Sequence, residues 1–440
     1  MIGRLLINSS AMLGGQLASV AITLIQSVIL ARAFGPEQFG KWALLISASS
    51  LIANFLAFRT SESLTCFWVE AREQNDANSA QVYLSSALIV EFATKLMAGF
   101  ATFIMGVALL GGIRATWDIV VAAALIGLYR FLSFGDAAWM SLMRDEKRIK
   151  ALSLLPTAQA MMQLCLIAVL LAVFGKGLFL AALSYVAAQT VFLVVKVDQT
   201  RSTAKRAGVA LLPLGNLRSL KPRWRAGFWK MMGAGYLSSC LSSLMKEGDT
   251  LVVGLVASDS SVGFYRLARS LVSVVQLVTQ AIATLILQDF AEIRRNGAAA
   301  VLSVVRRVAV PFAALVLAGC AVIAIALPAV IKMIYGPQYA GAVLPFRILL
   351  VGTAVSTSLF WVTPALIALR EVRAMLHISF MNFAAYVASM ALGIYLLQGT
   401  GPAVATSVAW TVGYSASLVW LLVVLRREKC RDHDEGTLPR

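Results

Sequence analysis

Charged residues are scarce in this sequence. Only 13% of its 440 residues are charged, 59% are hydrophobic, and the mean hydropathy is +0.81. A soluble globular protein of this length would carry more polar residues, so the composition excludes that class. Many apolar runs reach about 20 residues, which is the length that a helix needs to cross a bilayer. The sequence therefore predicts an all-α, polytopic membrane protein.

Histidine is nearly absent, and the cysteines follow no motif. His377 and His433 are the only histidines, and the five cysteines are scattered. Metal sites need clustered ligands, so we expect no metal, and we interpret the cysteines as structural thiols. No GxxxxGK[ST] phosphate loop occurs, which argues against ATP as the direct energy source. We expect no cofactor.

Long outer loops and a cleavable signal peptide are also missing. The first apolar run, 5–33, is too long for a signal-peptide core and has no convincing cleavage site. The connections that we place outside are too short for a catalytic domain, so we do not expect an enzyme. About twelve spans are expected, at 7–33, 40–58, 82–110, 118–142, 151–174, 177–197, 231–257, 262–288, 308–333, 342–368, 374–397 and 402–425.

Lysine and arginine alternate from one connection to the next. The connection at 59–81 is a mixed-charge stretch that contains two arginines, and those at 144–150 and 199–230 are basic, whereas those at 258–261 and 398–401 carry no basic residue. The positive-inside rule therefore places both termini in the cytoplasm. Because this asymmetry accounts for most of the net charge of +17, we expect no nucleic-acid partner. The basic linker ends in interleaved Trp and Arg residues, which favour contact with anionic membrane lipids.

Polar residues of the first span are repeated in the seventh. A shift of about 223 positions relates two sets whose spacings of 3, 4 and 3 keep each set on one helical face: Gln16, Ser19, Thr23 and Gln26, and Ser239, Ser242, Lys246 and Asp249. We predict a six-helix bundle at 1–198, a basic amphipathic linker at 199–230, a second bundle at 231–425 and a cytoplasmic tail at 426–440. An even number of spans in each half makes this a parallel repeat, expected around a central cavity.

Charges at membrane depth mark candidate sites, because they are costly there and usually face a bundle interior or a wet cavity. The cations are Lys95, Arg130, Lys246, Arg266 and Arg269, and the acids are Glu91, Asp136, Glu247 and Asp249. We interpret the cations as substrate-binding and the acids as candidates for a coupling ion. Arginine in particular offers a planar fork that matches phosphate oxygens.

Their spacing suggests which charges pair. Glu91 and Lys95 are four apart in the order that favours a helical ion pair. Arg130 and Asp136 are six apart, on different faces, so Arg130 needs a partner from another helix, water or a substrate. The eighth span carries one polar stripe, which we interpret as lining a cavity: Arg266, Arg269, Ser273, Gln276 and Gln280. Hydrogen bonding between helices would also explain the stripe.

Three stretches together resemble a known family: ARAFGPEQFGKWAL, GDTLVVGLVASDSSVGFYRLARSL and VIKMIYGPQYAGAVLPFRILL. They are similar to the polysaccharide-exporter and O-antigen flippase branch of the multidrug/oligosaccharidyl-lipid/polysaccharide (MOP) exporter superfamily. The resemblance implies two six-helix bundles and no hydrolytic site. It also implies transfer of polyprenyl-diphosphate-linked oligosaccharides across a bacterial inner membrane, for O-antigen, capsule or exopolysaccharide. Other polysaccharide assembly proteins are expected partners.

Two other functions remain open at this point. A multidrug-type cation antiporter of the same superfamily would favour an acidic, aromatic cavity, whereas cations are slightly more numerous here. A membrane polysaccharide polymerase or ligase would be expected to carry a sizeable outer loop with catalytic residues, which this sequence lacks.

Overall fold

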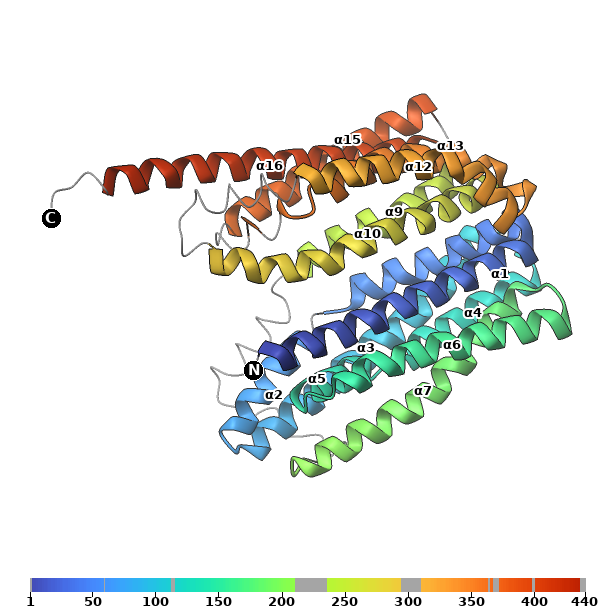
Figure 1. Cartoon of the computed structure of the whole chain (residues 1–440). Helices are drawn as coiled ribbons and strands as arrows, with labels where there is room; N and C mark the ends of the chain where they lie inside the picture. The colour runs from blue at the N-terminus through green and yellow to red at the C-terminus, as the bar shows by residue number, and fades with distance from the viewer. Residues whose placement is uncertain are drawn as a thin grey trace. The chain divides into compact units, whose positions relative to one another are not determined.

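The structure, a computed structural model, describes residues 2–58, 60–111, 115–209, 236–293, 310–362, 365–366, 372–397 and 400–435. Within these ranges the chain forms helices and no strand, and every expected span overlaps a helix (Figure 1). Among the described residues, eight helical stretches are long and apolar enough to cross a membrane. The predicted all-α, polytopic architecture is confirmed. The chain divides into two compact units, Met1–Leu251 and Val252–Arg440, and each is described by itself.

The first unit is a bundle of long helices joined by short connections. Its elements are α1 (Ile2–Leu56), α2 (Thr60–Glu73), α3 (Ala77–Leu110), α4 (Trp117–Leu132), α5 (Asp136–Asp145), α6 (Ile149–Phe174), α7 (Leu178–Arg206) and most of α9 (Tyr236–Val256). In this bundle α1 packs against α3 and α6, while α4 packs against both α3 and α7.

Helix α1 contains the first two expected spans. They are separated at Gly35, whose φ of 74° and ψ of 174° lie in a region that essentially only glycine occupies, and Pro36 follows. The FGP sequence therefore ends one span and begins the next without a long loop.

Helices α3 and α4 approach closely at two glycines. A Cβ atom on Gly127 would lie 2.6 Å from the carbonyl oxygen of Gly99, so no larger residue fits without moving a backbone. Small residues at such crossings are typical of helix packing in membranes. Because Gly127 is one turn before Arg130, this contact also fixes the position of the arginine.

The fourth expected span, 118–142, is interrupted. It consists of α4 and α5 with a break at residues 133–135, where Gly135 adopts a left-handed conformation (φ 83°). The break exposes the N-terminal N–H groups of α5, which require acceptors from elsewhere in the bundle.

The connection at 59–81 differs from the expected mixed-charge loop. Residues Thr60–Glu73 form α2, whose buried Leu64 and Trp68 pack with α3 and α5. The indole of Trp68 donates to Asp145 over 3.0 Å, and Arg72 forms an ion pair with the same carboxylate. Helix α2 is therefore an amphipathic cap on the end of the bundle.

The second unit contains the remaining described helices, α10 (Asp259–Ile293), α12 (Val310–Ile334), the 3₁₀ helix η5 (Pro337–Ala342), α13 (Val343–Ser358), α15 (Val372–Leu397) and α16 (Gly401–Glu435). Here α13 packs against α10, α12 and α16, and α15 packs against α16. Gly336 has a φ of 101° and precedes Pro337, so the YGP sequence repeats the glycine–proline turn of α1.

Two helices continue past the boundaries that the sequence predicts for the linker and the tail. Helix α7 continues to Arg206, so the linker predicted from residue 199 begins as helix, and residues 210–235 lie outside the described ranges. Helix α16 continues to Glu435, beyond the tail boundary predicted at 426, and residues 436–440 lie outside the described part of the chain. In both cases the helix extends past its apolar run into polar sequence.

Candidate functional site

Arg130 is held in place by two hydroxyl groups of another helix. Its Nε donates to Ser49 Oγ over 2.6 Å and its Nη2 donates to Ser50 Oγ over 2.8 Å. The guanidinium carbon also lies 5.3 Å from the centre of the Tyr129 ring. Of the three kinds of partner expected for Arg130, another helix provides these two hydroxyls. Two of its five N–H donors are used by the described residues, so three remain for other oxygen atoms.

Asp136 and Lys196 form an ion pair between α5 and α7, in which the lysine is buried and the aspartate half-buried. Lys196 Nζ lies 2.9 Å from Asp136 Oδ1 and also donates to Gln159 Oε1 over 3.2 Å. Gln159 donates in turn to Gln189 over 2.6 Å, and Gln189 donates to the carbonyl of Leu132 over 3.0 Å. This network connects α4, α5, α6 and α7 around the break at Gly135.

Glu91 accepts a hydrogen bond at the start of α5. Its Oε1 accepts from the backbone N–H of Ala137 over 3.0 Å, as expected where an exposed helix N-terminus needs an acceptor. Its other oxygen, Oε2, is buried without a hydrogen bond among the described residues. The predicted Glu91–Lys95 ion pair does not form in this part of the chain, because the carboxylate turns toward α5 instead.

Five charges therefore gather in the first unit: Glu91, Lys95, Arg130, Asp136 and Lys196. Lys95 interacts electrostatically with each of the other four, so they belong to one cluster. Four of them were predicted from their depth in the spans. Lys196 was not among the predicted site residues, yet it is only 6% exposed. Gln159 and Gln189, isolated amides within apolar runs, were the sequence signal that its helix carries a buried polar face.

The polar face of the first span serves helix packing. Gln26 is buried and its side chain donates to the carbonyl of Ala160 over 2.8 Å. Ser19 donates to Thr157 over 3.5 Å, while Thr23 is exposed and donates back to the carbonyl of Ser19. Ser19 and Gln26 thus connect α1 to α6 rather than lining an open surface. The side chain of Gln16 lies outside the described residues.

The predicted residues of α9 differ in exposure. Lys246 is exposed and Glu247 is half-buried. Asp249 is fully buried, and its Oδ1 accepts from the backbone N–H of Thr250 over 2.7 Å. The side chains of Ser239 and Ser242 lie outside the described part.

On α10 the stripe includes a cation–aromatic contact. The guanidinium of Arg269 lies 4.6 Å from the centre of the Trp410 ring, on α16. Arg266 and Gln276 are half-buried, and Ser273 is exposed. Arg269 is thus oriented by a neighbouring helix, while the side chain of Gln280 falls outside the described residues.

Comparison with known families gives one match. The model of the polysaccharide biosynthesis protein family matches residues 5–287, which is more than half of the chain. A search of curated proteins found no match.

Solved structures share the fold at low sequence identity. An inward-facing multidrug resistance MATE family transporter of the MOP superfamily matches with a TM-score of 0.74 and 14% identity, covering 93% of this chain and 95% of that one. The lipid II flippase MurJ, in an inward closed conformation, matches with a TM-score of 0.72 and 12% identity, covering 94% and 87%. A mutant of the Vibrio cholerae MATE transporter VcmN matches with a TM-score of 0.59 and 15% identity, covering 97% of both chains.

Proposed function

The chain belongs to the polysaccharide biosynthesis protein family, and from that premise we propose that it is a flippase for lipid-linked sugars. Its substrate is a polyprenyl-diphosphate-linked oligosaccharide, moved from the inner to the outer leaflet of a bacterial inner membrane. The product supplies the synthesis of a surface polysaccharide such as O-antigen, capsule or exopolysaccharide.

The observation that carries this proposal is the presentation of Arg130. Ser49 and Ser50 fix the plane of its guanidinium and leave three N–H donors without an acceptor among the described residues. A planar guanidinium of this kind suits two oxygens of a diphosphate. Lys95, in the same charge cluster, adds a second cation to attract the anion.

We further propose that transport proceeds by alternating access with both termini in the cytoplasm. Sugars and phosphates cannot cross hydrocarbon, so the head group needs a wet path that is never open at both ends. Reporter fusions at Ser260 and Gly399 should then report the outer compartment, whereas fusions at Gly215 and Gly436 should report the cytoplasm. An inside signal at Ser260 would contradict this topology.

A buried carboxyl group provides a candidate for coupling to a proton or sodium ion. Glu91 is 4% exposed and its Oε2 lacks a hydrogen bond among the described residues, so it can receive a proton without losing a contact there. Asp136 is less suited, because Lys196 already pairs with it. Asp249 and Glu247 remain candidates on α9. Glu91→Gln should therefore uncouple polymer export from the ion gradient, while Asp136→Asn should mainly reduce stability.

The test of the proposal is an export assay on charge variants. Arg130→Ala should leave the protein in the membrane and lower polymer export by about a hundredfold, since two charge-assisted contacts are worth roughly 3 kcal/mol. The double variant Arg130→Ala, Lys246→Ala should export still less. Normal export from the double variant would remove both residues from the site.

The multidrug cation antiporter remains the second candidate, favoured by the buried carboxyl of Glu91 and by the shared fold of the MATE transporters. It predicts that deletion of the gene sensitises cells to cationic drugs and leaves surface polysaccharide intact. The flippase proposal predicts the opposite pair of outcomes.

A further inference from the structure

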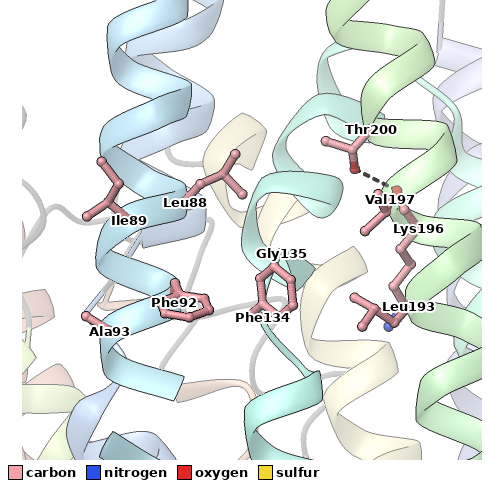
Figure 2. A pocket seen from close by; sticks show the side chains of 10 residues that line it. All are labelled: Leu88, Ile89, Phe92, Ala93, Phe134, Gly135, Leu193, Lys196, Val197 and Thr200. Carbon is pink, nitrogen blue, oxygen red and sulfur yellow. Dashed lines mark hydrogen bonds between the residues drawn. The ribbon is translucent and has the colours of Figure 1, made fainter. Parts of the chain in front are cut away.

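A pocket lies in the first unit, lined in part by residues next to the break at Gly135. It has a volume of about 450 Å³ and lies between α3 and α7, with the break between α4 and α5 as its floor (Figure 2). Helix α3 contributes Leu88, Ile89, Phe92 and Ala93, the break contributes Phe134 and Gly135, and α7 contributes Leu193, Lys196, Val197 and Thr200. A volume in this range is typical of ligand sites.

The pocket offers a ligand no free polar group. Lys196 lends only its aliphatic stem, because its ammonium group binds Asp136 and Gln159. The hydroxyl of Thr200 donates to the carbonyl of Lys196 over 2.7 Å, as the dashed line in Figure 2 shows. Every other lining side chain is apolar or glycine. The chemistry therefore selects a hydrocarbon chain.

The pocket is open to the side and closed at one end. Ile89 and Phe92 are both 45% exposed, so the hydrocarbon of a bilayer has access to it. At the end nearer the middle of the helices, the rings of Phe92 and Phe134 pack edge to face with centroids 5.9 Å apart. From Leu193 to Thr200 the pocket extends along about 10 Å of α7.

Basic residues follow the pocket along α7. Leu193 and Val197 line the pocket, and Arg201 and Lys205 follow at intervals of four, in a row that turns about 40° around the helix at each step, so that their long side chains flank the cytoplasmic end of the pocket. Arg201 and Lys205 are exposed, in the last two turns before α7 ends at Arg206. An apolar pocket followed by two cations is the order in which a lipid presents its acyl chain and its phosphate.

We propose that this pocket binds one acyl chain of an anionic phospholipid, whose phosphate contacts Arg201 and Lys205. In the topology proposed above, the lipid belongs to the cytoplasmic leaflet. The bound chain packs against the break at Gly135, directly behind the Lys196–Asp136 pair, and so supports the α5 end of the charge cluster. The site is separate from the proposed diphosphate contact at Arg130 and does not depend on the transported substrate.

Native mass spectrometry of the full-length protein tests the site, with added phosphatidylglycerol and phosphatidylcholine of the same chain length as probes. The wild type should retain phosphatidylglycerol preferentially. Ala93→Trp fills the pocket and should lower retention of both lipids by about tenfold, since it removes the buried contact area of the chain. Ala108→Trp, at another exposed alanine of α3 outside the pocket, is the matched control and should retain lipid as the wild type does.

A second variant tests the head-group contact without altering packing. Arg201→Gln with Lys205→Gln, both exposed, should reduce the preference for phosphatidylglycerol by about fivefold per residue while phosphatidylcholine binding is unchanged. Equal retention by the Ala93→Trp and Ala108→Trp variants, or no preference for the anionic lipid in the wild type, would overturn the proposal. Displacement of phosphatidylglycerol by equimolar polyprenyl phosphate would also overturn it, by assigning the pocket to the isoprenoid carrier.

Discussion

Arg130 and Lys246 are both basic residues within predicted membrane spans, but their surroundings differ. Arg130 is half-buried and held by two serine hydroxyls from α1. Lys246 is exposed on α9, and no described residue bonds to its ammonium group. A third cation, Lys196, is buried and paired with Asp136. The position of a cation within an apolar run therefore identifies it as a residue of a predicted span. It does not indicate whether the cation stabilises the fold or binds a ligand.

The three cations differ in how many of their N–H donors already have an acceptor on a neighbouring helix. The ammonium of Lys196 has an acid and an amide as acceptors, which leaves little capacity for a ligand. Arg130 has three N–H donors without an acceptor among the described residues, while its orientation is fixed by two serine hydroxyls. We therefore expect Lys196 to stabilise the fold and Arg130 to contribute to transport. Lys246 should affect neither the stability of the fold nor the geometry of the charge cluster.

The largest expected effect is on stability. Lys196→Met leaves Asp136 without its partner, and because the Asp136 side chain is 34% exposed the cost is about 2 kcal/mol, below that of a fully buried pair. The midpoint of thermal unfolding in detergent should fall clearly, whereas Lys246→Met should change the free energy of unfolding by less than about 0.5 kcal/mol. Replacing both partners, as Lys196→Met with Asp136→Leu, should recover much of the loss. Equal effects of Lys196→Met and Lys246→Met would contradict the comparison.

An intermediate effect is expected when Arg130 loses its support. Ser49→Ala with Ser50→Ala removes both hydrogen bonds to the guanidinium, each worth about 1.5 kcal/mol or more to a charged group. Because water can replace the hydroxyls, only part of that roughly 3 kcal/mol affects transport, and polymer export should fall by about twentyfold while the protein still inserts. Ser47→Ala, at a buried serine of α1 that does not contact Arg130, is the control. If all three serines behave alike, Arg130 is not positioned by these hydroxyls.

The smallest effect should distinguish shape from charge. Arg130→Lys keeps the charge but loses the planar fork, so export should fall by about tenfold, a change of about 1.4 kcal/mol. The reverse exchange, Lys246→Arg, should leave export within about twofold of the wild type, because nothing described constrains that side chain. A larger loss from Lys246→Arg than from Arg130→Lys would reverse the assignment of roles.

Much of the fold was predictable from local sequence. The spans at 82–110, 151–174 and 374–397 agree closely with α3, α6 and α15, because the length of an apolar run already matches the thickness of a bilayer. The interruption at Gly135 and the helix at Thr60–Glu73 were not predicted. Both depend on partners far along the chain: Glu91 for the start of α5, and α5 itself for the buried face of α2.

The sequence by itself determined that this protein is a polytopic helical membrane protein and where most of its charges enter the membrane, because hydropathy is a property of consecutive residues. Only the tertiary structure decided what those charges do. Lys196 and Asp136 are 60 residues apart, and Arg130 and Ser49 are 81 apart, so their contacts exist only once the helices are packed. A single helix records which residues share a face, but not which acceptor lies opposite that face, and the acceptor decides whether a cation is neutralised or remains able to bind an anion.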